Sequence, residues 1–165
     1  MKQLVLRETR SGFEPARTVL LASVSGLAAL AGLLTQFYRW GLHGIPYPFE
    51  DAAMLFRYAE VLANGGGIAY NPGQDPGLSD GATDLGFVIL LAPLISLGLK
   101  PATAGFAINA LAIMALGGLL AAINHQKWRL PWWVPALLGF GLGLTVASPV
   151  AGGFSSAVLG AGLVG

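Results

Sequence analysis

The chain contains no cysteine and few charged residues. The absence of cysteine among its 165 residues excludes disulfide bonds and metal sites built from thiolates. Charged residues make up 10% of the chain, whereas a soluble domain carries about 25%. Hydrophobic residues make up 55%, and the mean hydropathy is +0.67. The shortage of charge and the high hydropathy together indicate a membrane protein.

The sequence signatures of several enzyme classes are also missing. No P-loop, dinucleotide fingerprint, nucleophile elbow or zinc-ligand spacing occurs. The net charge is +1 and no basic cluster is present, so no nucleic-acid partner is expected. The long apolar segments hold no charge in their interior that would mark an ion path, which counts against a transporter.

Three apolar segments are long enough to cross a bilayer, which takes ~20 residues. They cover residues 18–40, 102–124 and 132–150. The first follows a basic tail, residues 1–17, and ends in the interfacial pair Arg39 and Trp40. A cleaved signal peptide is the alternative for this segment, but its apolar core would be shorter and would end in small residues. The positive-inside rule predicts a cytoplasmic tail and an external loop over residues 41–84.

A fourth apolar segment, residues 85–99, is short and contains Pro93. If it crosses the membrane, Lys127 and Arg129 lie outside. If it stays in the outer interface, both lie in the cytoplasm, as the positive-inside rule favours. We predict an all-α membrane protein with three transmembrane helices, or four if this segment crosses. Its external loop carries short juxtamembrane helices, and its 24 glycines suit close packing with other membrane helices.

The external loop opens with a predicted amphipathic helix over residues 50–64. Its apolar positions recur at helical spacing, and we expect this face to lie on the membrane surface; they are Met54, Leu55, Tyr58, Val61 and Leu62. Arg57 and Glu60 are three residues apart, which predicts a weak surface pair. Three glycines, residues 65–67, supply the helix stop.

Glu50 and Asp51 stand side by side at the start of this helix. Acids in a first turn complement the helix dipole, and this is the common reason for such a pair. A second interpretation is a general base held at the membrane surface. Neighbouring carboxylates can also help to bind a divalent cation, although two alone do not form a metal site. Farther along, Thr83 or Asp84 is expected to cap the next apolar helix.

The order of these motifs resembles the first third of GT-C glycosyltransferases that use polyprenyl-phosphate sugars. The likeness is greatest to the mycobacterial terminal arabinofuranosyltransferase type. It is more distant to protein mannosyltransferases and to the lipid A aminoarabinose transferase. It extends over about residues 15–125 and rests on six features in order. They are the basic tail with the first span, Glu50-Asp51-Ala52, Phe56-Arg57-Tyr58-Ala59, the glycine-rich break, Tyr70-Asn71-Pro72-Gly73, and Gly81-Ala82-Thr83-Asp84 with the short apolar helix.

The resemblance implies a multi-pass protein of the bacterial inner membrane that transfers a sugar from a lipid-linked donor to a cell-envelope hydroxyl. It implies that Asp51, with Glu50 beside it, is the catalytic base. Weaker candidates for substrate binding are Arg57, Tyr58, Tyr70 and Asn71. The cofactor is unknown, and a divalent cation is one option; no protein ligand set for a metal is predicted.

The sequence also departs from the family pattern. The family usually has Asp-Asp or Asp-Glu where this chain has Glu50-Asp51, and an aromatic residue, often Trp, where Leu85 stands. Family members have many more spans, so the chain is expected to be the N-terminal part of one, with residues 151–165 as its truncated end. The alternative is a non-enzymatic small membrane protein or an inactive transferase remnant.

Overall fold

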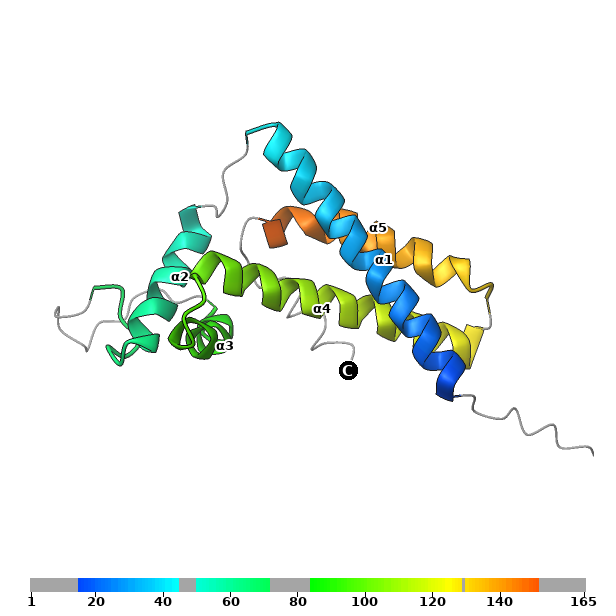
Figure 1. The fold of residues 1–165 in the computed structure, drawn as a ribbon, viewed down its shortest axis with the longest axis horizontal. Helices are drawn as coiled ribbons and strands as arrows, with labels where there is room; N and C mark the ends of the chain where they lie inside the picture. The colour runs from blue at the N-terminus through cyan, green and yellow to red at the C-terminus, as the bar shows by residue number, and fades with distance from the viewer. Residues whose placement is uncertain (1–14, 45–49, 72–83, 129, 152–165) are drawn as a thin grey trace, which may run out of the picture.

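The computed structural model is built from helices. It describes residues 15–44, 50–71, 84–128 and 130–151, and no strand occurs in these ranges, as an all-α fold predicts. The elements follow one another along the chain (Figure 1) as α1 (Pro15–Leu42), α2 (Glu50–Ala63), α3 (Leu85–Ser96), α4 (Pro101–Ile123), the short π-helix η1 (Asn124–Trp128) and α5 (Trp133–Ala151).

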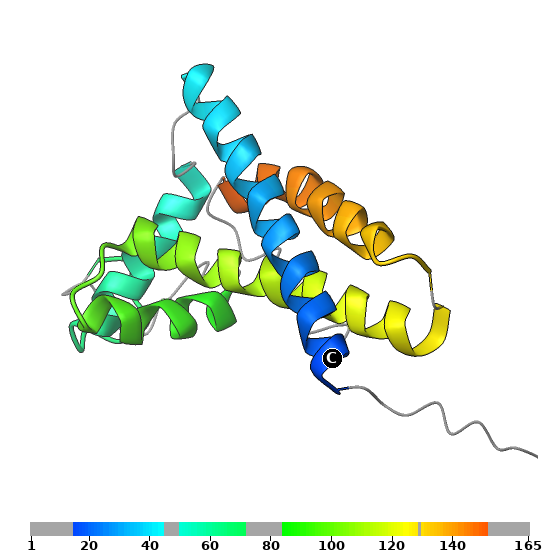
Figure 2. The same cartoon turned by 45° about the vertical axis from the view of Figure 1, so that its right-hand side comes forward.

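Helices α1 and α4 pack against each other in antiparallel orientation. Near the end of α1, the ring of Phe37 lies 5.1 Å from that of Phe106, close to the start of α4. At the opposite end, Thr18 Oγ1 lies 3.1 Å from Nδ1 of His125, just past the end of α4. The two contacts fix the direction of both helices, and Figures 1 and 2 show α1 crossing over α4.

Helix α5 runs parallel to α1 and packs against both α1 and α4. The Ser25 hydroxyl donates a 2.8 Å hydrogen bond to the carbonyl of Pro135, in the first turn of α5. Farther along both helices, the backbone around Gly32 approaches that of Phe140 and Leu144. The chain therefore runs in one direction in α1, returns in α4 and runs in the first direction again in α5.

Small residues allow this close approach. A Cβ atom added at Gly26 would lie 2.7 Å from the Met114 carbonyl oxygen on α4. One added at Gly117 or at Gly139 would lie 2.8 or 2.6 Å from the Ser25 carbonyl oxygen. Real Cβ atoms are not found at such distances, so α1 fits against both partners because the glycines lack side chains.

A second packed unit forms where α2 and α3 meet the beginning of α4. Its buried residues come from all three helices: Leu55, Phe56, Tyr58 and Ala59 of α2, Phe87, Val88 and Leu91 of α3, and Ala104 of α4. Figure 1 shows α2 and α3 beside this end of α4. The apolar face of α2, expected to lie on the membrane, is therefore covered by protein.

The buried face of α2 also differs by one position from the predicted one. Met54 is 42% exposed, whereas Phe56 is buried. Gly105 explains the difference, because a Cβ atom there would lie 2.8 Å from the Phe56 ring. The missing side chain leaves space that Phe56 fills, and helical spacing within α2 gives no sign of it.

The ends of α2 and α3 agree with the sequence predictions. Gly65 has a φ of +78°, and Gly65 N–H and Gly66 N–H bond to the carbonyls of Leu62 and Val61, the Schellman pattern. At the start of α3, the Asp84 carboxylate accepts a 3.3 Å hydrogen bond from the Phe87 N–H. This confirms Asp84 as the cap.

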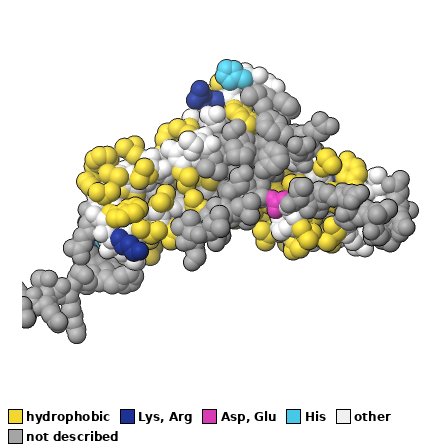
Figure 3. All heavy atoms as spheres, turned by 180° about the vertical axis from the view of Figure 1, so that it is seen from behind, with side chains coloured by type: hydrophobic (Ala, Val, Ile, Leu, Met, Phe, Trp, Pro, Cys, Tyr) yellow, Lys and Arg dark blue, Asp and Glu magenta, His cyan; other side chains and the backbone are white. Residues whose placement is uncertain are grey.

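Two helical segments are long and apolar enough to cross a membrane. They are Pro15–Leu42 and Pro101–Trp128, each of 28 residues, and about a third of the most apolar part of each is buried. The other residues of that part are partly buried or exposed. Figure 3 shows one face, on which hydrophobic side chains cover much of the described surface and charged ones appear as isolated spots. Two shorter apolar helical segments are Leu85–Ser96 and Trp133–Thr145.

Candidate functional site

The predicted catalytic acids stand at the beginning of α2. The structure begins this 14-residue helix at Glu50, so the backbones of Glu50 and Asp51 form its first turn. Their side chains lie outside the part of the chain that the structure describes. The helix dipole favours negative charge at this position, whether the acids serve structure or chemistry. Their role as a base remains a prediction.

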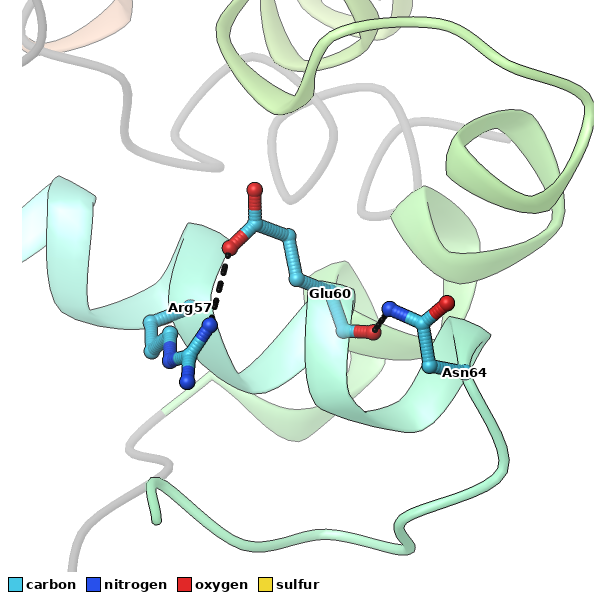
Figure 4. A network of polar contacts seen from close by, with 3 residues as sticks. All are labelled: Arg57, Glu60 and Asn64. Atoms are coloured by element: carbon cyan, nitrogen blue, oxygen red, sulfur yellow. Dashed lines mark hydrogen bonds and ion pairs between the residues drawn. The ribbon is translucent and has the colours of Figure 1, made fainter. Parts of the chain in front are cut away.

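Arg57, Glu60 and Asn64 form a small polar network on the outer side of α2 (Figure 4). Arg57 Nη1 lies 3.4 Å from Glu60 Oε2, and both side chains are well exposed to solvent. The Asn64 amide donates a 2.8 Å hydrogen bond to the Glu60 carbonyl. An exposed ion pair of this kind contributes ~0–1 kcal/mol. An anion that approached Arg57 would therefore displace only a weak partner.

The two candidate tyrosines lie against each other. Tyr58 is 3% exposed and belongs to the core between α2, α3 and α4, while Tyr70 is 43% exposed. Their ring centroids are 5.7 Å apart and the planes are inclined by 60°. The accessible aromatic surface belongs to Tyr70, and Tyr58 supports that ring from within. Asn71, the next candidate, is exposed beside Tyr70.

Three basic residues are found at the end of the bundle where α4 begins. Arg39 lies in the last turn of α1, Lys100 directly precedes α4, and Arg57 is carried by α2. The Phe37–Phe106 contact brings this end of α1 to α4, and the Phe56–Gly105 contact brings α2 there. The three-span topology predicted from the sequence places residues 39, 57 and 100 on the outer side, and these contacts show which elements bring them to one end.

The described side chains do not assemble a metal centre. Within residues 15–44, 50–71, 84–128 and 130–151, no group of three or more His, Asp or Glu side chains could hold a metal ion. The carboxylates of Glu50 and Asp51 are outside that description. A cation held there would need ligands beyond these two, such as water or substrate phosphate oxygens.

Comparisons of the chain with known protein families, with curated proteins and with solved structures found no match. The likeness to GT-C glycosyltransferases therefore rests on the order of the sequence motifs.

Proposed function

We propose that this chain takes part in sugar transfer from a polyprenyl-phosphate donor to a hydroxyl group of the cell envelope, at the outer face of the membrane. The observation that carries the proposal is the order of its motifs. The pair Glu50-Asp51 begins the next helix after α1, which is long enough to cross a membrane. The Tyr70-Asn71-Pro72-Gly73 motif comes next, and the described part of this loop packs against the start of α4.

The proposed reaction needs a base and a positive partner for the leaving group. Asp51, with Glu50 beside it, takes the proton of the acceptor hydroxyl while the hydroxyl oxygen bonds to the anomeric carbon. The bond from that carbon to the phosphate oxygen breaks, and polyprenyl phosphate leaves with the electron pair. Arg57 stabilises the phosphate charge, with Arg39 and Lys100 as alternatives on the same end of the bundle. Tyr70 and Asn71 contact the sugar, and Tyr58 holds the Tyr70 ring in place.

The topology that goes with this function has three spans. If α1 crosses outward, its antiparallel partner α4 crosses inward and α5 crosses outward again. Both α2 and α3 then lie on the outer side, between the end of α1 and the start of α4. A crossing α3 would instead make α1 and α4 parallel. At 1.5 Å per residue the 12 residues of α3 span about 18 Å, short of the ~30 Å hydrocarbon core.

In this topology α3 lies in the outer membrane interface. One of its faces, with Phe87, Val88 and Leu91, is buried against α2 and α4. The opposite face exposes Ile89 and Leu90, and these side chains enter the lipid. Helix α2 packs on α3 and α4, which contact the membrane, and its own apolar face does not. This packing keeps Glu50 and Asp51 near the headgroup layer.

Transfer is measured in membranes from cells that express the full chain, with a panel of radiolabelled polyprenyl-phosphate pentoses and hexoses as donors. We expect Asp51→Asn to lower label incorporation into the envelope fraction by ~10²–10⁴, the usual contribution of a positioned base. Asp84→Asn is the matched control, because it removes a carboxylate of the same loop and keeps an oxygen that can accept the Phe87 N–H bond. Full activity in Asp51→Asn would remove Asp51 from the role of base.

The second candidate is a non-enzymatic membrane protein that acts through its helix packing. The glycine contacts between α1, α4 and α5 favour a stable bundle whether or not the chain catalyses a reaction. Absence of label transfer from every donor, with the protein inserted in the membrane, would favour this candidate over sugar transfer.

A further inference from the structure

The connection from α4 to α5 presents three exposed tryptophans at the end of the bundle opposite α2. Trp128, Trp132 and Trp133 are 56%, 63% and 50% exposed. Large aromatic side chains with one polar N–H group are enriched at membrane interfaces, where the ring is in apolar surroundings and the N–H meets water or headgroups. Figure 2 shows this end of α4 beside the start of α1.

Local hydrogen bonds hold the tryptophans in this position. The buried Asn124 side chain both donates to the Leu130 carbonyl and accepts from the Leu130 N–H, each at 3.2 Å. This two-way bond closes the turn that follows η1. The Thr18–His125 contact attaches the same turn to the first residues of α1. The turn is therefore closed by its own hydrogen bonds and attached to α1 through His125.

The charged side chains that the structure describes at this end of the bundle are basic. Arg17 precedes Thr18 in α1, and Lys127 is exposed within η1 beside Trp128. The only other titratable side chain described here is His125, which faces Thr18. The structure describes two acidic side chains, Glu60 and Asp84, and both lie at the opposite end of the bundle. The chain has no Asp or Glu after Asp84, so α4, α5 and their connection carry no negative side chain.

We propose that this tryptophan and lysine surface binds the anionic headgroups of the adjacent membrane leaflet. The tryptophan rings insert at the level of the glycerol and upper acyl chains, and Lys127 contacts lipid phosphates, with Arg17 adding to the positive field. The bulk bilayer supplies the apolar part of this contact, and the positive charge selects phosphatidylglycerol over a zwitterionic lipid. The proposal rests on the membrane topology and is independent of sugar transfer.

Selectivity is measured with the full chain reconstituted in phosphatidylcholine vesicles that hold roughly 30% phosphatidylglycerol, an anionic content that gives a negative surface potential. The chain has four tryptophans, so Trp40→Phe leaves only the three of this surface as fluorophores. Either the phosphatidylglycerol or the phosphatidylcholine carries brominated acyl chains, which quench tryptophan on contact. We expect phosphatidylglycerol to quench more than its share of the bilayer predicts, and added salt to reduce this excess.

In the same background, Lys127→Gln is expected to lower the phosphatidylglycerol preference severalfold, up to roughly fivefold for one basic side chain. Lys100→Gln is the control, because Lys100 is an exposed lysine at the other end of α4; it should leave the preference unchanged. The proposal would be overturned by any of three results. Phosphatidylglycerol could quench only in proportion to its share of the bilayer, its preference could be insensitive to salt, or both variants could lose the same amount of preference. None of these results depends on transferase activity.

Discussion

At the scale of single residues, glycine size decides how close α1 and α5 can lie. Gly143 is buried, and a Cβ atom there would be 2.8 Å from the Leu33 backbone nitrogen and even closer to the Ala29 carbonyl oxygen. Gly141 lies two residues away in the same helix, and a Cβ atom there meets nothing within 4 Å. These glycines differ in surroundings and share the same helical backbone, so they form a matched pair.

We predict that Gly143→Ala destabilises the bundle and that Gly141→Ala does not. The added methyl group at 143 forces α5 away from α1, at a cost of ~1–3 kcal/mol for overpacking of a tight interface. At 141 the methyl group enters open space, and the helix gains from the better helix former by up to ~1 kcal/mol. Unfolding by denaturing detergent in mild micelles, followed by circular dichroism, measures both. Equal stability of the two variants would contradict the close packing at 143.

At the scale of elements, the sequence predicted α2 and the caps well because both depend on local patterns. Helical spacing and the glycine stop predicted residues 50–64 against the observed 50–63. The turn before the apolar run offered Thr83 or Asp84 as the cap, and the structure shows Asp84. What local patterns could not show is the partner of each face. Leu85–Ser96 is apolar on all sides, so its spacing does not reveal that Phe87 and Leu91 pack on α2 while Ile89 and Leu90 face outward.

The candidate site shows the same division. The order of the acids, Arg57 and the tyrosines can be seen in the sequence, and the Arg57–Glu60 pair was predicted from three-residue spacing. Helical spacing placed Tyr58 on the apolar face, but the partners that bury it, α3 and α4, come later in the chain. The contact that brings the end of α1 to α4 is also long-range. The periodic spacing within α2 shows which face is apolar and does not show which helices cover it.

We predict that Asp84→Ala weakens α3 without unfolding the bundle. The variant loses the side-chain acceptor for the Phe87 N–H, and loss of an N-cap costs ~1 kcal/mol. Amide hydrogen exchange should become faster in α3 and in α2, which packs on it, and stay unchanged where α1 meets α5. Asp84→Asn is the control, because it keeps an acceptor oxygen and a strong capping preference. Faster exchange across every helix would mean that α3 is not a separate cooperative unit.

At the scale of the whole molecule, the antiparallel directions of α1 and α4 place different contacts at opposite ends of the bundle. Thr18 meets His125 at one end, while Phe37 meets Phe106 at the other, beside α2 and α3. The proposed site and the proposed lipid-binding surface therefore lie at opposite ends of α4. A three-span topology assigns them to opposite sides of the membrane, and a four-span topology does not allow antiparallel α1 and α4.

Cysteine labelling separates the two topologies, because the natural chain has no cysteine and each introduced thiol is the only one. Asn64, Ser96 and Gln126 are all exposed, in or next to α2, α3 and η1. With three spans, an impermeant thiol reagent added outside intact cells labels Asn64→Cys and Ser96→Cys and fails to label Gln126→Cys until the membrane is permeabilised. With four spans, Ser96→Cys is shielded and Gln126→Cys is labelled. Asn64→Cys reacts in both cases and serves as the positive control. Labelling of Gln126→Cys from outside together with shielding of Ser96→Cys would overturn the three-span arrangement. It would also overturn the assignment of α3 to the outer interface.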